Sequence, residues 1–456
     1  MRTLKLHHWI LIAMVLGAGI GLPLSHFGNN GTIDPDVVAT IADVGKRVGD
    51  LFLQLLKMLV VPLIVSSLIS GVTGMGDLRQ LGKLGGRTML FYLSTSAIAI
   101  LTGVVFVNLI MPGEGVPLSL LQEGAEGAAL PTVAEEGQGL GAVLWDQLKG
   151  MIPSNPLHAA AEGDMLPVIF FSILIGVFIS LVEHGKVEGE SDAETQARLD
   201  ASIVRRFFTG LFAVMMKMTL AVIALAPIGV FGFMLYAAAG HGFAAFRALG
   251  WYALTVFVAL VVHAFITLPA ILYVLGRKNP WHHAQAMVPA LLTAFSTASS
   301  NGTLPLTMQC VEKSGVPNRI GSFVLPLGAT INMDGTALYE AVAVLFIAQV
   351  YGLDLSIGQQ LVVALTALLA SVGAAGIPHA GTVMMVVVLG AVGLPTTAVG
   401  LILAVDRVLD MCRTTVNVWS DSAAAVLISR FPTEPPTELP TQPTHSNGAP
   451  PHPPPS

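Results

Sequence analysis

A row of charged and polar residues lies in the last apolar segment of the chain, residues 396–428. Three acids, one arginine and one asparagine recur there at intervals of three or four residues: Asp406, Asp410, Arg413, Asn417 and Asp421. On a helix these positions fall within about 80° of one another. A charge that faces lipid at the centre of a bilayer costs on the order of 3 kcal/mol or more. We therefore expect this face to line a polar site that binds a charged solute within a membrane.

Arg413 and Asp410 together suit an acidic amino acid. The guanidinium group of Arg413 presents a planar fork of donors that matches a carboxylate. Asp410 lies one turn earlier and can accept hydrogen bonds from an ammonium group. The alternative is a plain buried ion pair between the two residues. Three further polar residues on the same helical face favour a binding site over that alternative.

Hard oxygen ligands in several apolar segments indicate sites for a small cation. Carboxylates and amides, with backbone carbonyls, match such a cation better than a transition metal. The side chains are Asn332, Asp334, Asn417 and Asp421, with the hydroxyl groups of Tyr92, Thr95 and Ser96. Gly335 in the Asn-Met-Asp-Gly run lets the backbone unwind and free its carbonyls; a simple kink is the alternative. For Thr95 and Ser96 the alternative is hydrogen bonding to their own helix.

Two further titratable residues each allow two interpretations. Glu340 lies one to two turns beyond Thr336 in the same segment, where burial disfavours a charged carboxylate. It could carry a proton with each working cycle, or form a static hydrogen bond. His379 follows Pro378 at the tip of a broken apolar segment and could sense pH. A solvated loop histidine is the alternative there.

The composition is that of a polytopic membrane protein. Of the 456 residues, 54% are hydrophobic and only 11% are charged, whereas soluble domains contain about 25% charged residues. The 47 glycines are typical of close-packed membrane helices. A formal net charge of -6 gives no support for a nucleic-acid role. The two cysteines, Cys310 and Cys412, do not suggest a disulfide framework.

Eight apolar segments are long enough to cross a membrane. They are residues 8–26, 48–74, 88–111, 166–183, 207–239, 249–275, 321–350 and 396–428. Arg2 and Lys5 precede the first segment, but no convincing small-residue cleavage site ends it, so we interpret it as a retained helix. Two more segments, 284–310 and 358–394, are broken by Ser-Asn-Gly and Gly-Ile-Pro. Their halves of about 10–14 residues are too short to span and indicate re-entrant hairpins.

The charged loops predict the orientation in the membrane. Lys and Arg gather after the second, fourth and sixth segments, whereas the loop 113–148 carries acids without Lys or Arg. The positive-inside rule therefore places both termini in the cytoplasm. Each hairpin precedes a span with polar residues, and the two enter from opposite sides. Such an inverted repeat predicts a binding site near the midplane.

The longest motifs resemble those of the dicarboxylate/amino acid:cation symporters, which include the glutamate transporters. They are the serine-rich hairpin ending in Gly-Thr-Leu-Pro (302–305), the run Gly-Ala-Thr-Ile-Asn-Met-Asp-Gly-Thr-Ala-Leu-Tyr (328–339), the tip Ala-Ala-Gly-Ile-Pro (374–378) and Leu-Asp-Met-Cys-Arg-Thr-Thr-Val-Asn-Val (409–418). The resemblance covers nearly all of residues 8–430. It implies a homotrimer with an elevator mechanism, in which a transport domain moves against a static scaffold.

The resemblance also implies how the chain is divided. The scaffold would comprise residues 1–78 with spans one and two, and 166–245 with spans four and five. The transport domain would comprise 79–112 and 246–430, with the other four spans and both hairpins, of which the outer is the extracellular gate. An extracellular acidic loop with the entry to span four (113–165) and a disordered Pro-rich cytoplasmic tail (431–456) complete the chain. We expect an all-α integral protein of the inner or plasma membrane, with eight transmembrane helices and two re-entrant hairpins.

The same resemblance assigns the site residues. Arg413 matches the arginine that binds the side-chain carboxylate of the substrate, and Asp410 the aspartate that binds its amino group. The expected substrate ligands are Ser299, Ser300, Asn301, Met333, Thr336, Gly381, Asp410, Arg413, Thr414 and Asn417. The expected sodium ligands are Tyr92, Thr95, Ser96, Asn332, Asp334, Ser371, Asn417 and Asp421. Glu340 matches the glutamate that carries the proton in proton-coupled members.

The sequence departs from the family pattern near the substrate site. Many members carry an arginine either just before the hairpin-one serines or directly after the position of Asp410, where this chain has Ala298 and Met411. The charge balance of the site and any potassium counter-transport therefore stay open. In addition, Asn301 replaces a serine, and His379 stands where relatives have Gly or Gln.

The leading hypothesis is uptake of L-glutamate or L-aspartate driven by sodium ions, protons or both, without a resident cofactor. An alternative within the same family is a symporter for C4 dicarboxylates or small neutral amino acids. An alternative of another class is an anion-conducting channel, because polar helix faces can line pores; two closed hairpins favour an occluded site instead. An intramembrane enzyme is disfavoured, because the polar spans present no metal-ligand His cluster and no Ser/His pair.

Overall fold

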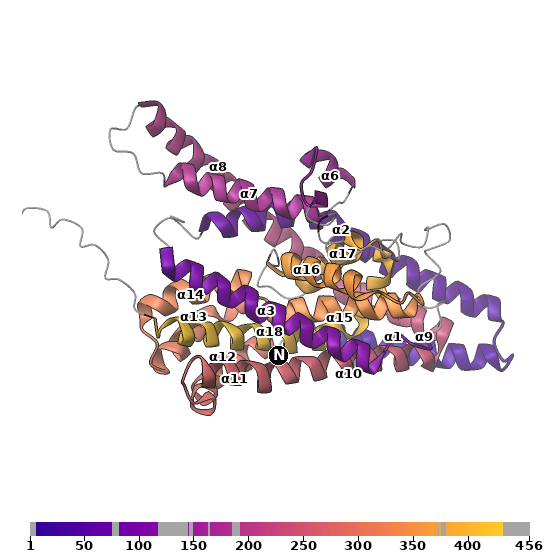
Figure 1. The fold of residues 1–456 in the computed structure, drawn as a ribbon. Coiled ribbons are helices and arrows are strands. Elements are labelled where there is room, and N and C mark those ends of the chain that lie inside the picture. Colours follow the sequence, from indigo (N-terminus) through magenta and orange to yellow (C-terminus); the bar gives the residue numbers. More distant parts are fainter. Residues whose placement is uncertain are drawn as a thin grey trace, which may run out of the picture.

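In a computed structural model of the chain, the structure describes residues 6–74, 82–116, 145, 149–162, 165–184, 192–372, 374 and 380–431 (Figure 1). Within these ranges every regular element is helical. The helices are α1 (Leu6–Asn29), α2 (Pro35–Gly74), α3 (Gly82–Ile110), α6 (Pro156–Glu162), α7 (Met165–Glu183), α8 (Asp192–Ile223), α9 (Ala226–His241), α10 (Phe243–Val262), α11 (Leu268–Val274), α12 (Pro280–Thr297), α13 (Ser300–Lys313), α14 (Asn318–Ile331), α15 (Asp334–Val350), α16 (Ile357–Val372), α17 (Ala380–Ala391) and α18 (Val399–Ile428). A π-helical turn, His263–Thr267, joins α10 to α11, and a 3-10 turn, Thr396–Ala398, precedes α18.

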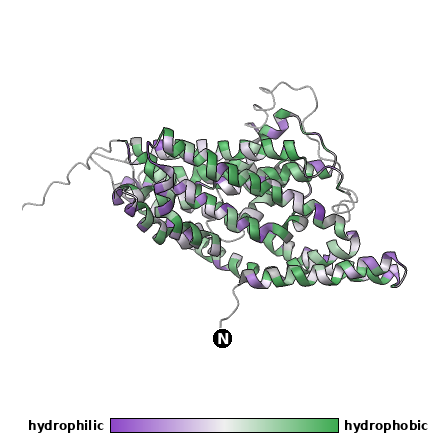
Figure 2. Ribbon diagram, turned by 90° about the horizontal axis from the view of Figure 1, so that it is seen from below, coloured by the Kyte–Doolittle hydropathy of each residue, from purple (hydrophilic) through white to green (hydrophobic). Residues whose placement is uncertain are grey.

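Six of the described helical segments are long and apolar enough to cross a membrane: His8–Asn29, Pro35–Gly74, Leu84–Ile110, Ala193–Ile223, Phe246–Val274 and Asn318–Val350. Apolar residues run along the length of the helices in Figure 2, and large apolar side chains such as Phe265 and Leu109 are exposed. Such exposure suits lipid rather than water. The chain is therefore an all-helical, multi-pass membrane protein.

The eight expected crossing segments all fall on helices, but three of them are divided. The segment 207–239 breaks between α8 and α9, and 249–275 contains the π-helical turn. The segment 321–350 breaks between α14 and α15. Because the helices do not themselves define crossings, the number of eight stays a prediction.

The break between α14 and α15 occurs at the Asn-Met-Asp-Gly run, as the sequence predicted. Asn332 has φ -91° and ψ 79°, and Met333 has φ -109° and ψ 52°, so neither residue is helical. The helix resumes at Asp334. The run is thus an unwound stretch between two helices and not a simple kink.

The first broken segment forms a helical hairpin of α12 and α13, which pack against each other. The side chain of Asn279 accepts a hydrogen bond from the Trp281 amide and caps α12. Ala298 ends α12 in the left-handed region, with φ 51°. The extended residue Ser299 then caps α13, its Oγ accepting from the Gly302 amide at 3.0 Å. This cap and the left-handed residue together produce the sharp reversal of the chain.

The second broken segment forms a hairpin of α16 and α17, which also pack against each other. Residues 375–379, which include Pro378 and His379 of the predicted tip, lie outside the described residues. Both helices of the hairpin also contact α15.

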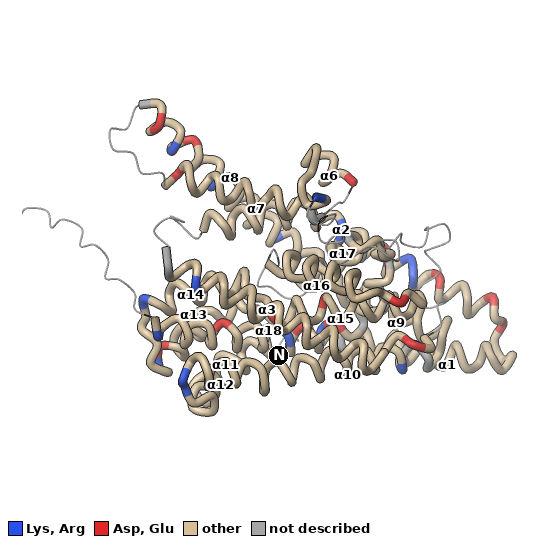
Figure 3. Tube along the Cα trace, viewed as in Figure 1, with Lys and Arg blue, Asp and Glu red and all other residues tan. Residues whose placement is uncertain are grey.

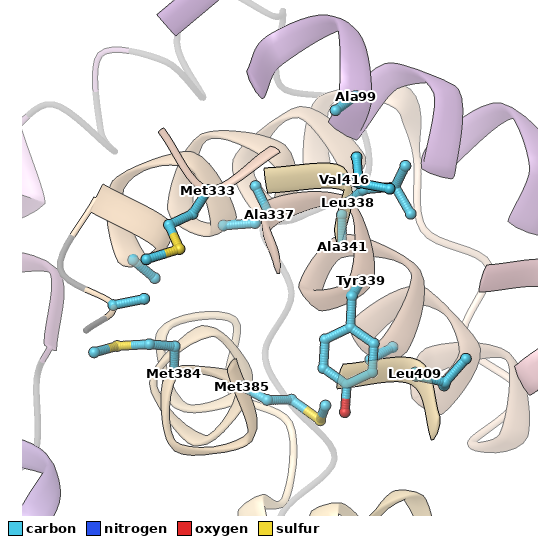
Figure 4. Packing of buried hydrophobic residues seen from close by; sticks show 14 of the residues in the cluster. Ala99, Met333, Ala337, Leu338, Tyr339, Ala341, Met384, Met385, Leu409 and Val416 are labelled. Atoms are coloured by element: carbon cyan, nitrogen blue, oxygen red, sulfur yellow. The ribbon is translucent and has the colours of Figure 1, made fainter. Parts of the chain in front are cut away.

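α15 lies at the centre of the packing. Every described residue of α15 except Gln349 is buried, and the helix contacts α3, α10, α16, α17 and α18. Figure 4 shows the apolar part of this core, where Met333 and Tyr339 face Met384 and Met385 of α17. A second group of contacts joins α1, α2, α7, α8 and α9, which extend beyond the core in Figure 1. In Figure 3 charged residues are sparse along the helices, and most of them lie towards the helix ends.

Candidate functional site

Charged side chains of α18 form one buried network. The guanidinium group of Arg413 donates from Nη1 to Oδ1 of Asp406 at 2.9 Å and from Nε to Oδ1 of Asp410 at 3.1 Å. Arg407 adds a second arginine, with Nη1 3.4 Å from Oδ2 of Asp410. The helical periodicity therefore predicted correctly that Asp406, Asp410 and Arg413 share one face. The ion pair between Asp410 and Arg413, which the sequence left as an alternative, exists as part of this larger set.

Asp406 and Tyr339 hold Arg413 from two sides. The guanidinium carbon of Arg413 lies 4.1 Å from the centre of the Tyr339 ring, a cation–π arrangement. The Tyr339 hydroxyl donates to Oδ1 of Asp406 at 2.8 Å, and Thr382 donates to Oδ2 at 2.6 Å. Asp406 thus ties α15, α17 and α18 together. The planar group of Arg413 is thus held in one orientation, which lowers the entropic cost of binding a carboxylate.

Gly381 of the second hairpin lies directly against Arg413. A Cβ atom at this position would lie 2.9 Å from Cζ of Arg413 and 3.1 Å from Cγ2 of Thr336. Both distances are shorter than an ordinary carbon contact. Only glycine allows α17 to approach the arginine this closely.

Asn417 connects the polar row to the start of α15. Its Oδ1 accepts from the Gly335 amide at 2.7 Å, and its Nδ2 lies 3.2 Å from Oγ1 of Thr336 and 3.3 Å from Sδ of Met333. The amide groups at the beginning of α15 also carry the partial positive charge of a helix N-terminus. The three expected ligands Met333, Thr336 and Asn417 are therefore in mutual contact.

Asp334 gathers the hydroxyl groups of α3. Ser96 donates to its Oδ1 at 2.6 Å, and Thr95 lies 3.3 Å from the same oxygen and 3.4 Å from Oδ1 of Asn332. The Thr95 hydroxyl also lies 3.1 Å from the Phe91 carbonyl, so it can hydrogen-bond to its own helix as well as to this cluster. Residues more than 230 positions apart in the sequence thus meet in one oxygen-rich cluster.

Asp421 continues this cluster on α18. Nδ2 of Asn332 donates to Oδ1 of Asp421 at 2.9 Å and to the Ser420 hydroxyl at 3.0 Å. The hydroxyl of Tyr92 donates to the Val324 carbonyl at 2.6 Å. Gly328 lies between them, because a Cβ there would contact both Asp421 and the Tyr92 hydroxyl. Asn332 therefore links the hydroxyl groups of α3 to the carboxylate of Asp421 on α18.

His263 and Ser420 approach Asp334 from the opposite side. Nε2 of His263 lies 3.1 Å from Oδ2 of Asp334, and Ser420 donates to that oxygen at 2.6 Å. Neither residue is among the site residues predicted from the sequence. A histidine inside an apolar segment is a recognisable sign of a polar site. That His263 meets Asp334, however, could not be identified from sequence spacing.

The remaining predicted residues lie in different surroundings. Ser371 is buried and donates to the Leu368 carbonyl at 2.9 Å. Thr414 and Ser300 are buried, whereas Asn301 is exposed. Glu340 is fully buried, and neither of its carboxylate oxygens has a hydrogen-bond partner among the described residues.

The oxygen cluster is chemically suited to sodium. Among the described residues no group of three or more His, Cys, Asp or Glu side chains could hold a metal ion. Hydroxyl, amide and single carboxylate oxygens, as found around Asp334, are hard donors of low total charge. The guanidinium of Arg413, by contrast, can recognise a carboxylate in a bidentate way.

The chain is similar over most of its length to known symporters and amino acid transporters. The sequence profile described as the sodium:dicarboxylate symporter family matches residues 6–431. The chain is 34% identical over 432 residues to the proton/sodium-glutamate symport protein of Bacillus caldotenax, covering 94% of this chain and 95% of that protein. It is 34% identical over 422 residues to the proton/glutamate-aspartate symporter of Escherichia coli (strain K12), with 92% of each chain covered. An excitatory amino acid transporter of Caenorhabditis elegans is 37% identical over 428 residues, or 84% of this chain and 80% of that protein.

Proposed function

The chain belongs to the sodium:dicarboxylate symporter family, and from this premise we propose that it is a secondary active symporter for L-glutamate or L-aspartate. The coupling ions are sodium, protons or both. Relatives that match more than nine-tenths of the chain are named as glutamate or glutamate-aspartate symporters. The observation that carries the proposal is the pre-formed Arg413–Asp410 pair under Gly381. Symport moves the solute unchanged, so the protein is a transporter and not an enzyme.

In the proposed site, Arg413 binds the side-chain carboxylate of the substrate and Asp410 binds its ammonium group. The α-carboxylate is bound by the hairpin tips, through Ser299, Ser300 and Asn301 on one side and Gly381 on the other. Met333, Thr336, Thr414 and Asn417 complete the wall. The mutual contacts of Met333, Thr336 and Asn417 support this assignment, because they bring α18 and the unwound stretch to one place.

Sodium ions are proposed to bind at three places. One site uses Tyr92, Thr95, Ser96, Asn332 and Asp334, whose oxygens cluster as described. Another uses Asn417 and Asp421, with backbone carbonyls of the unwound stretch. A third site near Ser371 would use mainly backbone. The cluster around Asp334 is the best supported, because its side chains already face one another.

Glu340 is the proposed proton carrier. A carboxyl group that is buried without a hydrogen-bond partner must either be neutral, with a proton bound, or acquire a hydrogen-bond partner. It also lies on α15, the helix that carries Thr336 and the sodium ligand Asp334. A proton taken up and released there would travel with the substrate.

We further propose eight crossings, two re-entrant hairpins in an inverted repeat, and an elevator mechanism in a homotrimer. The two groups of helix contacts support the division into a scaffold (1–78 and 166–245) and a transport domain (79–112 and 246–430). In this arrangement the second hairpin opens to the outside of the cell. The protein lies in the inner or plasma membrane, and both of its termini lie in the cytoplasm.

Uptake into proteoliposomes tests the function. Radiolabelled L-glutamate and L-aspartate are offered with an inward sodium gradient at equal pH, and separately with a proton gradient without sodium. We expect saturable accumulation under at least one gradient. Accumulation with sodium alone would assign the coupling to the oxygen cluster, and accumulation with protons alone to Glu340. Failure of both would contradict acidic amino acid symport, and non-saturable flux would indicate a channel.

A further inference from the structure

We propose that Thr382 controls the closure of the second hairpin, through a hydrogen bond that it donates to Asp406 while α17 covers the site. Thr382 is thereby a positioning residue and not a substrate ligand. This inference rests on the proposed function, because the hairpin covers the proposed substrate site.

Thr382 is the one residue of α17 with a side chain that can donate a hydrogen bond. The helix reads Ala-Gly-Thr-Val-Met-Met-Val-Val-Val-Leu-Gly-Ala, so its other side chains are apolar or absent. Apolar contacts are non-directional, whereas a hydrogen bond fixes both distance and direction. Thr382 and Asp406 are 1% and 0% exposed, and Oγ1 of the threonine donates to Oδ2 of the aspartate at 2.6 Å. This bond therefore defines where the first turn of α17 lies.

The Thr382 hydroxyl bonds to another helix rather than to its own. Other buried threonines, such as Thr219 and Thr255, donate to a carbonyl of their own helix. Thr382 donates to a carboxylate of α18 instead. A hydrogen bond to a charged acceptor contributes more than one between neutral groups. Its loss should therefore shift the balance between closed and open hairpin by about tenfold.

Asp406 couples the closed hairpin to the substrate. Its Oδ1 accepts from Arg413 and Tyr339, whereas its Oδ2 accepts from Thr382. When a substrate carboxylate also binds Arg413, more acids share the charge of one guanidinium, and Asp406 depends more on its hydroxyl donors. An acidic substrate therefore strengthens the Thr382 contact, and the closed hairpin strengthens substrate binding in return.

L-Aspartate uptake by variants of Thr382 is the first test. T382V keeps the shape of the side chain but cannot donate, so the KM should rise about tenfold. The maximal rate per folded carrier should change little. T382S restores the donor and should restore the wild-type KM. T366V is the matched control and should keep it, because Thr366 is fully buried in the other arm of the hairpin and its hydroxyl has no hydrogen-bond partner among the described residues.

Thiol labelling measures the opening of the hairpin without any transport. Met333 faces α17 in Figure 4, so M333C should react with a membrane-impermeant maleimide only when α17 moves away. Cys310 and Cys412 are replaced by alanine for this purpose. In the absence of substrate, labelling should be several-fold faster with T382V than with Thr382 intact. Y339F removes a hydrogen bond to the same carboxylate from outside the hairpin, and should not accelerate labelling.

The outcomes separate this proposal from the proposed function. An unchanged KM in T382V, or equal labelling rates with and without T382V, overturns the role of Thr382. An equal rise of KM in T366V, or equally fast labelling with Y339F, overturns it as well, because the effect is then not specific to the Thr382 contact. A wild-type carrier that transports no acidic amino acid overturns the proposed function instead, and the labelling rates still decide whether Thr382 holds the hairpin closed.

Discussion

His263 and Asp334 meet inside the protein, with Nε2 of the histidine 3.1 Å from Oδ2 of the carboxylate. Ser420 donates to the same oxygen, which leaves Oδ1 to face Ser96 and Thr95. The histidine therefore orients a residue that we propose as a sodium ligand. Groups behind a ligand commonly fix its direction in this way and tune the affinity for the ion.

Replacing His263 by Gln should weaken sodium binding. Loss of a group that supports a ligand typically costs about tenfold or more in metal affinity, so the sodium concentration for half-maximal L-glutamate uptake should rise by about that factor. His283 is the matched control: it is buried like His263, but its Nε2 lies 3.1 Å from Ser422 and not beside Asp334. Equal sodium dependence in H263Q and H283Q would refute the positioning role.

Ser96 should matter more than Thr95 for sodium coupling. Ser96 makes a hydrogen bond of 2.6 Å to Asp334, whereas Thr95 approaches that carboxylate at 3.3 Å and also bonds to its own helix. We expect S96A to raise the half-saturating sodium concentration several-fold, and T95A to raise it less. The measurement is sodium-dependent uptake at a fixed membrane potential. The reverse order would indicate that backbone bonding of Thr95 does not compete with the ion.

Gly381→Ala should block substrate binding. The added Cβ would lie 2.9 Å from Cζ of Arg413, so the hairpin or the arginine must move. Uptake should fall about tenfold or more, because the carboxylate-binding group is displaced. Gly390 lies in the same helix, and a Cβ there would meet nothing within 4 Å, so G390A should transport normally. Similar activity of the two variants would show that α17 does not close on Arg413.

Glu340→Gln should remove the pH dependence of uptake. If Glu340 carries the proton, wild-type uptake rises as the external pH falls. The isosteric amide of the variant cannot bind and release this proton, so its uptake should not respond to pH. Uptake driven by a proton gradient without sodium should then disappear in the variant. Glu312 is an exposed acid on α13, and E312Q should retain the wild-type pH profile. A pH profile that survives in E340Q would exclude Glu340 as the carrier.

The parts of the fold that local sequence signals specify were predictable. Ser-Asn-Gly marked the reversal at Ser299, where a cap and a left-handed residue end one helix and begin the next. The Asn-Met-Asp-Gly run marked the unwinding at Asn332 and Met333. The spacing of charges marked the polar face of α18. Each of these features depends on residues that are close in the sequence. It could therefore be predicted without knowledge of any tertiary contact.

Contacts between distant helices were not predictable in the same way. The approach of His263 to Asp334 and of Tyr339 to Asp406 depends on how α10, α15 and α18 are rotated against one another. A helical period gives the face of one helix but not the helix that it meets. Arg407 was missed for another reason: it lies about 100° from Asp406 around α18, outside the row of polar residues, although its i,i+3 spacing to Asp410 is one at which helix side chains meet.

The π-helical turn at His263–Thr267 accommodates one residue more than an α-helical turn of the same length. It places His263 towards Asp334, and the neighbouring Ala264 carbonyl accepts a hydrogen bond from Trp419 Nε1 at 3.0 Å. Deleting a single residue here would let the turn close into a regular α-helix with both halves of the span in their present register, but it would redirect the side chains of the turn itself, His263 among them. The extra residue in this span therefore serves the direction of His263 towards the oxygen cluster around Asp334, and the thickness of the membrane does not require it.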